Sequence, residues 1–277
     1  MSKKSDVDGI RTIHPIIASG KNRLVDIDPR STCGFKGEKA DALAILDQLG
    51  AQLVELQTVL YAEHKHKVLI VLQATDTGGK DGVIRRVFSG VNPMGVHIAS
   101  FKAPTQQEKD HDYLWRVHKC TPAKGDMVVF NRSHYEDVLV TRVEGWIDDR
   151  TARRRFRQIN DFEAMLVEEG TIVLKFFLHI SRDEQKKRLQ ERIDDPAKNW
   201  KFNLDDLTAR TKWDKYQSAF DDTLNATSSQ HAPWYIVPAD RNWVRDLYVC
   251  SVIVSTLNSL KMTYPDPPAG LSSTVIK

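Results

Sequence analysis

The segment Gln73–Gly82 places a tight glycine turn between an apolar run, Val68–Leu72, and a helical pattern that starts at Val83. A buried strand, a glycine turn and a helix in this order are typical of a phosphate-binding loop. Glycines allow backbone N–H groups to converge, and the helix N-terminus adds partial positive charge. The pattern predicts a phosphate site formed by the backbone of Gly78, Gly79, Asp81 and Gly82, with Lys80 reaching the outer phosphates.

The loop departs from the usual phosphate-loop pattern at two positions. Ala74 stands where the first glycine is expected, and Asp81 stands where a serine or threonine would bind magnesium. Asp76 adds a carboxylate close to the expected phosphates, which is repulsive unless a cation lies between them. We therefore expect Asp76 to hold Mg²⁺, with Mn²⁺ as an alternative ion. The structural alternative is a glycine turn that ends a buried strand, with Lys80 solvated.

Apolar runs that are typical of buried strands recur along the chain, and helical patterns lie between them. The expected strands are 67–72, 96–101, 127–130, 171–180 and 234–237, and one apolar helical face spans 43–60. Thr105 with Glu108 and Ser181 with Glu184 are two capping-box signatures. Continuous apolar strands predict a parallel sheet covered on both faces, in a three-layer α/β/α fold. We expect one domain over residues 1–277, with an N-terminal arm at about 1–35 and a lid insertion at about 182–210.

A group of polar residues, Asn131–Asp137, follows the third expected strand. Ligands of doubly wound folds bind at the carboxyl ends of strands, so this group should face the glycine loop. Asn131 can offer an oxygen to Mg²⁺ or to its bound water, and Glu136 can assist. Arg132 can bind phosphate oxygens through two hydrogen bonds. The alternative is an exposed, hydrogen-bonded turn.

A second charged segment, 181–201, follows the fourth expected strand. Arg188 and Arg192 lie one turn apart on the same helical face, and the segment after them contains Pro196 and suits a mobile lid. An ordinary solvated helix with i,i+4 ion pairs is the alternative. Because the preceding strand should end beside the phosphate loop, we expect both arginines to close over phosphates. Arg116 is a weaker candidate for the same role.

Composition limits the classes of function. The formal charge of +3 is too small for a general affinity for polyanions, so any such site must be local. The three cysteines are far apart and match no metal or redox motif, and no apolar run approaches the ~20 residues that span a bilayer. Without a signal segment, we expect a soluble cytoplasmic protein with no membrane partner.

These motifs together resemble the polyphosphate kinase 2 family over residues from about 35 to about 265. The resemblance rests on 75–82, 89–93, 114–116, 131–137, 175–181, 184–185, Arg188, Arg192 and 200–201. It implies a P-loop kinase core with a helical lid, Mg²⁺ dependence, and phosphoryl transfer between inorganic polyphosphate and a nucleotide. The family's loop aspartate, loop lysine and lid arginines correspond to Asp76, Lys80, Arg188 and Arg192. Lys201 is expected to bind phosphate from the lid.

The segment after the third strand indicates a subgroup. Family members specialised for diphosphates usually carry an Asp-Arg-Ser-Trp-Tyr-Asn-Arg type motif there. This chain has Asn131, His134, Glu136 and Asp137 instead, and resembles the class III subgroup that accepts both AMP and ADP. The expected acceptors are adenine nucleotides, with guanine nucleotides as an alternative. The apolar helix at 43–60 leaves room for a subunit interface, so we expect a homo-oligomer, either a dimer or a tetramer.

Two other classes of function are weighed against this interpretation. An ATP-dependent nucleotide kinase of the same fold would use the lid on ATP, and a donor test with polyphosphate and no ATP separates the two. A non-catalytic protein that binds polyanions or nucleic acid through 182–201 is the second. The nearly neutral chain has no recognised nucleic-acid module, so we expect no nucleic-acid partner.

Overall fold

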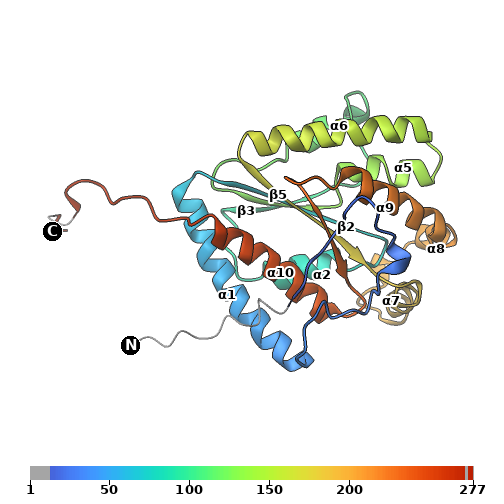
Figure 1. Cartoon of the computed structure of the whole chain (residues 1–277), viewed down its shortest axis with the longest axis horizontal. Helices are drawn as coiled ribbons and strands as arrows, with labels where there is room; N and C mark the ends of the chain where they lie inside the picture. Colours follow the sequence, from blue (N-terminus) through green and yellow to red (C-terminus); the bar gives the residue numbers. More distant parts are fainter. Residues whose placement is uncertain (1–12, 272–273, 277) are drawn as a thin grey trace.

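The computed structural model describes residues 13–271 and 274–276, which form a sheet between two layers of helices (Figure 1). Strand order in the sheet is β1-β6-β5-β2-β4-β3. The strands are β1 (Ile16–Ile17), β2 (Lys67–Ala74), β3 (Val96–Ser100), β4 (Met127–Asn131), β5 (Thr171–His179) and β6 (Trp234–Pro238). Strands β2 to β6 are parallel, as predicted. The sequence did not predict β1, which pairs antiparallel with β6 and makes the sheet mixed, because two residues are too few to show a period.

The helices cover both faces of this sheet (Figure 1). One layer contains α1 (Lys39–Glu63), α2 (Lys80–Val87) and α10 (Asn242–Ser259). The other contains α5 (Val140–Val143), α6 (Asp149–Glu168) and α9 (Trp213–Thr227). Beyond one end of the strands lie α7 (Arg182–Asp194) and α8 (Leu204–Thr211). The remaining short elements are α3 (Gln106–Lys109), α4 (Trp115–His118), and the 3₁₀ turns η2 (Leu24–Asp26), η3 (His134–Asp137) and η4 (Asn199–Lys201).

Strand β2 shows why the apolar runs are continuous rather than alternating. Its even-numbered residues, Val68, Ile70 and Leu72, pack into the cluster formed with α1, α2 and α10. Leu69 and Val71 point the other way, into the cluster formed with α6 and α9. Since successive side chains of a strand face opposite sides of the sheet, a sheet covered on both faces requires apolar residues at every position. The predicted α/β/α layering is therefore confirmed.

One of the two predicted capping boxes is complete. At α3, Thr105 Oγ1 accepts from the Glu108 N–H, and Glu108 Oε2 accepts from the Thr105 N–H. At α7, Ser181 Oγ accepts from the Glu184 N–H, but the Ser181 N–H donates to Asp240 Oδ1 at 2.7 Å. This box is therefore half formed. Asp240, which follows β6, ties the start of α7 to the end of a neighbouring strand.

The structure describes part of the predicted N-terminal arm and the helices of the predicted lid. Residues 1–12 of the predicted arm lie outside the described residues, and residues 13–38 contribute β1 and η2. His179 Nε2, at the last residue of β5, lies 3.1 Å from the Ile27 carbonyl oxygen, so this segment is held against the carboxyl end of that strand. The predicted lid consists of α7, η4 and α8. The division into one domain with an arm and a mobile lid stays a prediction.

No helix within residues 13–271 or 274–276 combines the length and the apolar character needed to cross a bilayer.

A buried ionic network fixes the turn that follows β4. Lys175 on β5 is 0% exposed, and its Nζ lies 2.6 Å from Glu163 Oε2 on α6 and 2.9 Å from the Tyr135 hydroxyl. Glu163 Oε1 also accepts from the Tyr135 hydroxyl at 2.7 Å and faces His134 Nε2 at 3.3 Å. Burial opposes ionisation of Glu163, but the Lys175 ammonium and then His134 lower the pKa of this carboxyl. The network therefore joins β5 and α6 to η3.

We expect Glu163→Gln to lower the free energy of unfolding by about 3–5 kcal/mol, because it leaves the Lys175 ammonium buried without its counter-ion. The measurement is urea denaturation followed by circular dichroism. Arg86→Met, which removes the exposed pair with Asp47, is the control and should cost less than about 1 kcal/mol. Equal losses in the two variants would contradict this account of the network.

Candidate active site

The glycine loop connects β2 to α2 through a turn with little free space. Gly79 is the N-cap of α2 and has φ of +100°, a conformation that favours glycine. A Cβ added to Gly78 would lie 2.3 Å from the Ala74 Cβ and 2.9 Å from the Thr75 carbonyl oxygen. Ala74 therefore replaces the usual first glycine because Gly78 leaves room for its methyl group. The Gly78 N–H donates to the Thr75 carbonyl oxygen at 3.0 Å and closes the turn.

Lys80 folds back over this turn. Its Nζ donates to the Ala74 carbonyl oxygen at 3.3 Å. Burial and then the charge of Arg132 lower the pKa of Lys80, whereas Asp76 and Glu136 act in the opposite direction. The ammonium thus lies among the other charged groups that the sequence predicted for the site, rather than in solvent.

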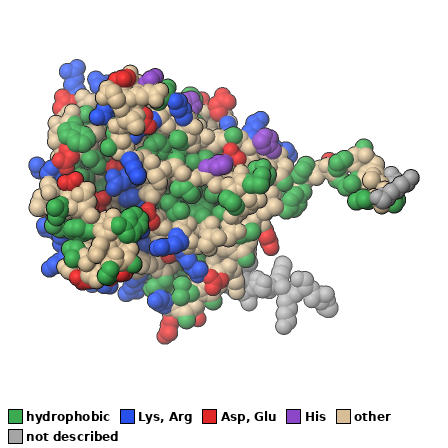
Figure 2. All heavy atoms as spheres, turned by 180° about the vertical axis from the view of Figure 1, so that it is seen from behind, with side chains coloured by type: hydrophobic (Ala, Val, Ile, Leu, Met, Phe, Trp, Pro, Cys, Tyr) green, Lys and Arg blue, Asp and Glu red, His purple; other side chains and the backbone are tan. Residues whose placement is uncertain are grey.

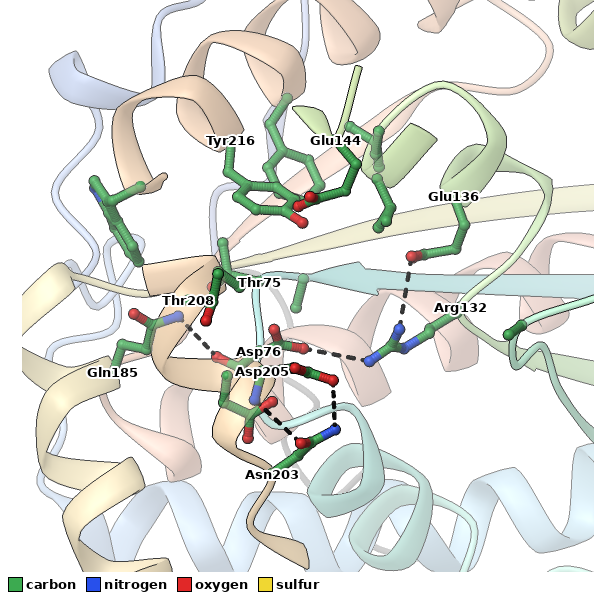
Figure 3. A pocket seen from close by; sticks show the side chains of 18 of the residues that line it. Thr75, Asp76, Arg132, Glu136, Glu144, Gln185, Asn203, Asp205, Thr208 and Tyr216 are labelled. Atoms are coloured by element: carbon green, nitrogen blue, oxygen red, sulfur yellow. Dashed lines mark hydrogen bonds and ion pairs between the residues drawn. The ribbon is translucent and has the colours of Figure 1, made fainter. Parts of the chain in front are cut away.

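Asp76, Arg132 and Glu136 form a chain of ion pairs above the loop (Figure 3). Arg132 Nη2 lies 3.3 Å from Asp76 Oδ1, and Arg132 Nη1 lies 3.7 Å from Glu136 Oε2. Arg132 has φ of +63°, which is rare for a bulky residue and changes the chain direction immediately after β4. Burial raises the pKa of Glu136, although Arg132 and Lys80 oppose the rise. Residues 131–137 therefore face the glycine loop, as the sequence predicted.

Asp81 links the loop to two other elements. Asn131 Nδ2 at the end of β4 donates to Asp81 Oδ1 at 2.9 Å, and Lys201 Nζ on η4 lies 3.7 Å from Asp81 Oδ2. The residue at the usual serine or threonine position thus contacts both the sheet and the segment 182–211. The amide of Asn131 contacts Asp81 rather than Asp76.

The two arginines of α7 lie in different surroundings. Arg188 Nη1 donates to the Thr77 carbonyl oxygen at 3.1 Å, Nη2 donates to the Ala239 carbonyl oxygen at 2.6 Å, and Nε contacts Glu184. Arg192 Nη1 lies 3.1 Å from Asp206 Oδ2. Arg188 therefore links the loop, through the Thr77 carbonyl oxygen, to the residue that follows β6, and Arg192 binds a carboxylate of α8.

Arg116 lines a neighbouring cavity of the site. Its side chain is 9% exposed, Nη1 donates to the Lys102 carbonyl oxygen at 2.8 Å, and Nη2 lies 3.7 Å from Asp137 Oδ2. It lines a cavity of about 500 Å³ that Arg132 also lines. Arg116 and Arg132 thus face one space, but Arg116 is not part of the group around Asp76.

A larger cavity of about 560 Å³ opens beside Asp76 and Arg132 (Figure 3). Its lining is rich in carboxylates: Asp76, Glu136, Glu144, Asp205 and Asp206. Burial and then the charge of Asp76 raise the pKa of Asp206, as expected for two carboxylates that face one space. Trp146, Trp213 and Tyr216 add aromatic surface to the same cavity.

Several residues of the site were not predicted from the sequence. Gln185 Nε2 donates to the Asp76 carbonyl oxygen at 3.3 Å, and Asp206 faces both Asp76 and Arg192. Arg245 on α10 lies against the loop glycines. A signal for Arg245 was present, since Arg245 and Asp246 are charged residues at the start of an otherwise apolar helical stretch. Gln185 belongs to the segment 184–185 that carries the family resemblance, but its residue type gave no indication of a contact with the loop backbone.

Positive side chains gather around the same end of the molecule. In the view of Figure 2, most lysine and arginine side chains lie over the end opposite the C-terminal extension, which is the end that carries α7 and α8. Basic residues of this region include Arg182, Lys186, Lys187, Arg188, Arg192, Lys198, Lys201 and Arg210. The same segment also carries seven carboxylates, so its eight basic side chains leave residues 182–211 with a formal charge of only +1.

A glycine loop between a central parallel strand and a helix, with lysine, arginine and carboxylate side chains converging above it, defines a phosphotransferase with a P-loop kinase-like fold. Comparison with protein families agrees with this class, because the model of the family "Polyphosphate kinase 2" matches residues 36–265. The chain belongs to the polyphosphate kinase 2 family.

Individual relatives extend over nearly the whole chain. The AMP/ADP-polyphosphate phosphotransferase of Meiothermus ruber is 53% identical over 258 residues, which are 93% of this chain and 97% of that protein. The ADP-polyphosphate phosphotransferase of Rhodopseudomonas palustris is 47% identical over 261 residues, 89% of this chain and 90% of that protein. The crystal structure of polyphosphate kinase 2 from Arthrobacter aurescens superposes with a TM-score of 0.89 at 44% identity, covering 91% of each chain.

We expect Gly78→Ala to reduce phosphotransferase activity by about 100-fold or more, because the added Cβ displaces the loop from its tight turn. Gly50→Ala is the matched control, since a Cβ at that position on α1 meets nothing within 4 Å. Both variants should show a cooperative thermal transition by circular dichroism, and the rates are compared per folded molecule. Wild-type activity in Gly78→Ala would show that the close packing at Ala74 is unimportant.

Proposed function

We propose that this enzyme transfers phosphoryl groups reversibly between inorganic polyphosphate and adenine nucleotides, with both AMP and ADP as acceptors. The observation that carries the proposal is the meeting of Lys80, Arg132 and Asp76 above the glycine loop, at the mouth of a large cavity. The two relatives described above differ in their names, one AMP/ADP and the other ADP, so family membership alone leaves the acceptor range open. The residues Asn131, His134, Glu136 and Asp137 favour the dual acceptor range. A cytoplasmic homo-oligomer and acceptance of guanine nucleotides stay predictions.

The donor set fits a magnesium ion held partly by substrate. Within the described ranges, no group of three or more His, Cys, Asp or Glu side chains is arranged to hold a metal ion. Mg²⁺ is commonly bound by one or two carboxylates together with phosphate oxygens and water, so a complete protein cage is not required. The like charges of Asp76 and Asp206 at one cavity also favour a cation between them.

We assign Asp76 as the principal ligand of Mg²⁺, or of Mn²⁺ as the alternative, with Asn131 and Glu136 as supporting groups. The hydroxyls of Thr75 and Thr77 are buried and have no hydrogen-bond partner within the part of the chain that the structure describes. They are further oxygen donors next to Asp76. When bound, the ion neutralises charge on the phosphates that face the Asp76 carboxylate.

The reaction requires positioning and charge neutralisation rather than a general base. An oxygen of the acceptor phosphate is ionised near neutral pH and attacks the terminal phosphorus of polyphosphate. The phosphoanhydride bond to the next phosphate breaks, and the shortened polyphosphate leaves with the electron pair. Lys80 and the loop backbone hold the donor phosphates, and Arg132 orients the acceptor phosphate. Because a phosphoanhydride bond is both broken and formed, the transfer is readily reversible.

The cavity of about 560 Å³ is the proposed position of the acceptor nucleoside. Its aromatic side chains can pack against a base, and its carboxylates can accept hydrogen bonds from ribose hydroxyls and from a base amino group. Arg132 lies at the boundary of this cavity, where the acceptor phosphate must meet the donor.

With Mg²⁺ and long-chain polyphosphate and without ATP, we expect AMP to yield ADP and then ATP, and ADP to yield ATP. Nucleotide products are separated by anion-exchange chromatography. Conversion of ADP with AMP inert would keep the polyphosphate donor but refute the dual acceptor range. An absence of product with polyphosphate, together with transfer from added ATP, would favour an ATP-dependent kinase. Salt-dependent RNA binding without turnover would favour a polyanion-binding protein.

Alanine at Lys80 or at Asp76 should reduce kcat by roughly 10²–10³-fold, because each removes charge stabilisation at the transferring phosphoryl group. Lys124→Ala is the control, since this exposed lysine precedes β4 at the opposite edge of the sheet. In the Asp76→Ala variant, the Mg²⁺ concentration for half-maximal rate should also rise. Full activity of either purified, folded variant would refute the site assignment.

A further inference from the structure

A buried arginine lies directly behind the glycine loop. Arg245 on α10 is 3% exposed. A Cβ added to Gly79 would lie 2.1 Å from its Nη1, and a Cβ added to Gly82 would lie 2.8 Å from its Nη2. The guanidinium therefore packs across the junction at which the loop becomes α2, in contact distance of two of the loop glycines.

The position of Arg245 explains a glycine that the phosphate-loop pattern does not require. Gly82 lies in the first turn of α2, where glycine is disfavoured relative to other residues. Its φ is not in the left-handed region, so the backbone conformation would accept alanine. The contact with Arg245 Nη2 is what excludes a side chain. Glycine at position 82 is a poor helix former, but it leaves the space that the Arg245 guanidinium occupies.

Arg245 is held in a fixed orientation by its own helix. Its Nε donates to Asp246 Oδ1 at 2.8 Å, and its Nη1 donates to Asn242 Oδ1 at 2.8 Å. Arg188 also donates to Asn242 Oδ1, at 3.2 Å, and its Nη1 would lie 3.5 Å from a Cβ at Gly79. Two arginines, one from α7 and one from α10, therefore share an asparagine and converge on Gly79.

We propose that Arg245 is a positioning residue for the phosphate loop, which holds the Gly79–Gly82 backbone in place from the side of α10 and adds a buried positive charge behind the bound polyphosphate. A fixed charge in a water-excluded environment acts on nearby phosphates more strongly than a solvated one. A backbone fixed before the substrate binds also avoids the cost of ordering the loop during the reaction. The electrostatic role of Arg245 rests on the proposed polyphosphate donor, whereas its packing role does not.

The packing role is tested by a double-mutant cycle in urea denaturation with the variants Gly82→Ala, Arg245→Met and their combination. We expect Gly82→Ala to lower the midpoint of unfolding in the wild-type background but not in the Arg245→Met background, where the guanidinium is absent. Equal shifts in both backgrounds would overturn the proposal. If Arg245→Met does not fold because Asp246 is left unpaired, the cycle is built on Arg245→Met/Asp246→Asn, which removes the buried charge as well.

The kinetic role is tested by varying polyphosphate at saturating acceptor. We expect Arg245→Met to reduce kcat/KM for polyphosphate by up to about 100-fold per folded molecule, with KM for the acceptor unchanged. Arg245→Lys keeps the charge and should recover part of the loss. Arg157→Met removes one exposed positive charge from α6 on the other layer and should have no effect. A wild-type kcat/KM in Arg245→Met, or no recovery in Arg245→Lys, would overturn the electrostatic part.

The use of polyphosphate by the wild-type chain and the contact of Arg245 with the loop are tested by separate measurements. If the wild-type chain does not use polyphosphate, the proposed donor is wrong, and the denaturation cycle still decides whether Arg245 holds the loop. If the wild-type chain is active and the cycle is additive, the proposed function stands and the inference about Arg245 is wrong.

Discussion

Strand β2 lies in the middle of the sheet, hydrogen-bonded to β4 on one side and to β5 on the other, and the positions of the functional side chains depend on this pairing. In the parallel register, Leu72 lies beside Asn131 and Ala74 lies beside Leu178. All three strands therefore end at one edge. The glycine loop, the turn at Arg132 and the start of α7 emerge together at that edge, although each is about 50 residues from the next along the chain.

Bringing these segments together also concentrates charge, and the structure balances it pair by pair. Arg132 lies between Asp76 and Glu136, Lys175 pairs with Glu163, and Asp246 orients the Arg245 guanidinium. The cavity beside Asp76 is the exception among the described residues of the site, because carboxylates outnumber cations in its lining. That excess suits a cation and a ligand with hydrogen-bond donors. Lysine and arginine side chains gather instead at the end of the molecule that carries α7 and α8 (Figure 2).

The layered fold was predictable because burial on both faces leaves a simple trace in the sequence. Runs such as Val68–Leu72 must be apolar at every position, and β2 through β6 lie close to their predicted bounds. Strand β1 left no such trace, being two residues long. The glycine loop was predictable because a tight turn restricts residue type at Gly78 and Gly79, whatever surrounds it. The second predicted capping box was only half right, since Asp240, distant in sequence, takes the Ser181 N–H.

The sequence by itself determined the class of fold, the family, and the residue types that chemistry on phosphates requires, because these depend on local patterns. Tertiary structure alone decided which charges meet. It placed Arg188 against the Thr77 carbonyl oxygen of the loop rather than in open solvent, and it placed Asn131 against Asp81. It also brought Arg245, about 160 residues further along the chain, against Gly79 and Gly82. Such contacts depend on distances between elements that are remote in sequence, and a one-dimensional pattern carries no information about those distances.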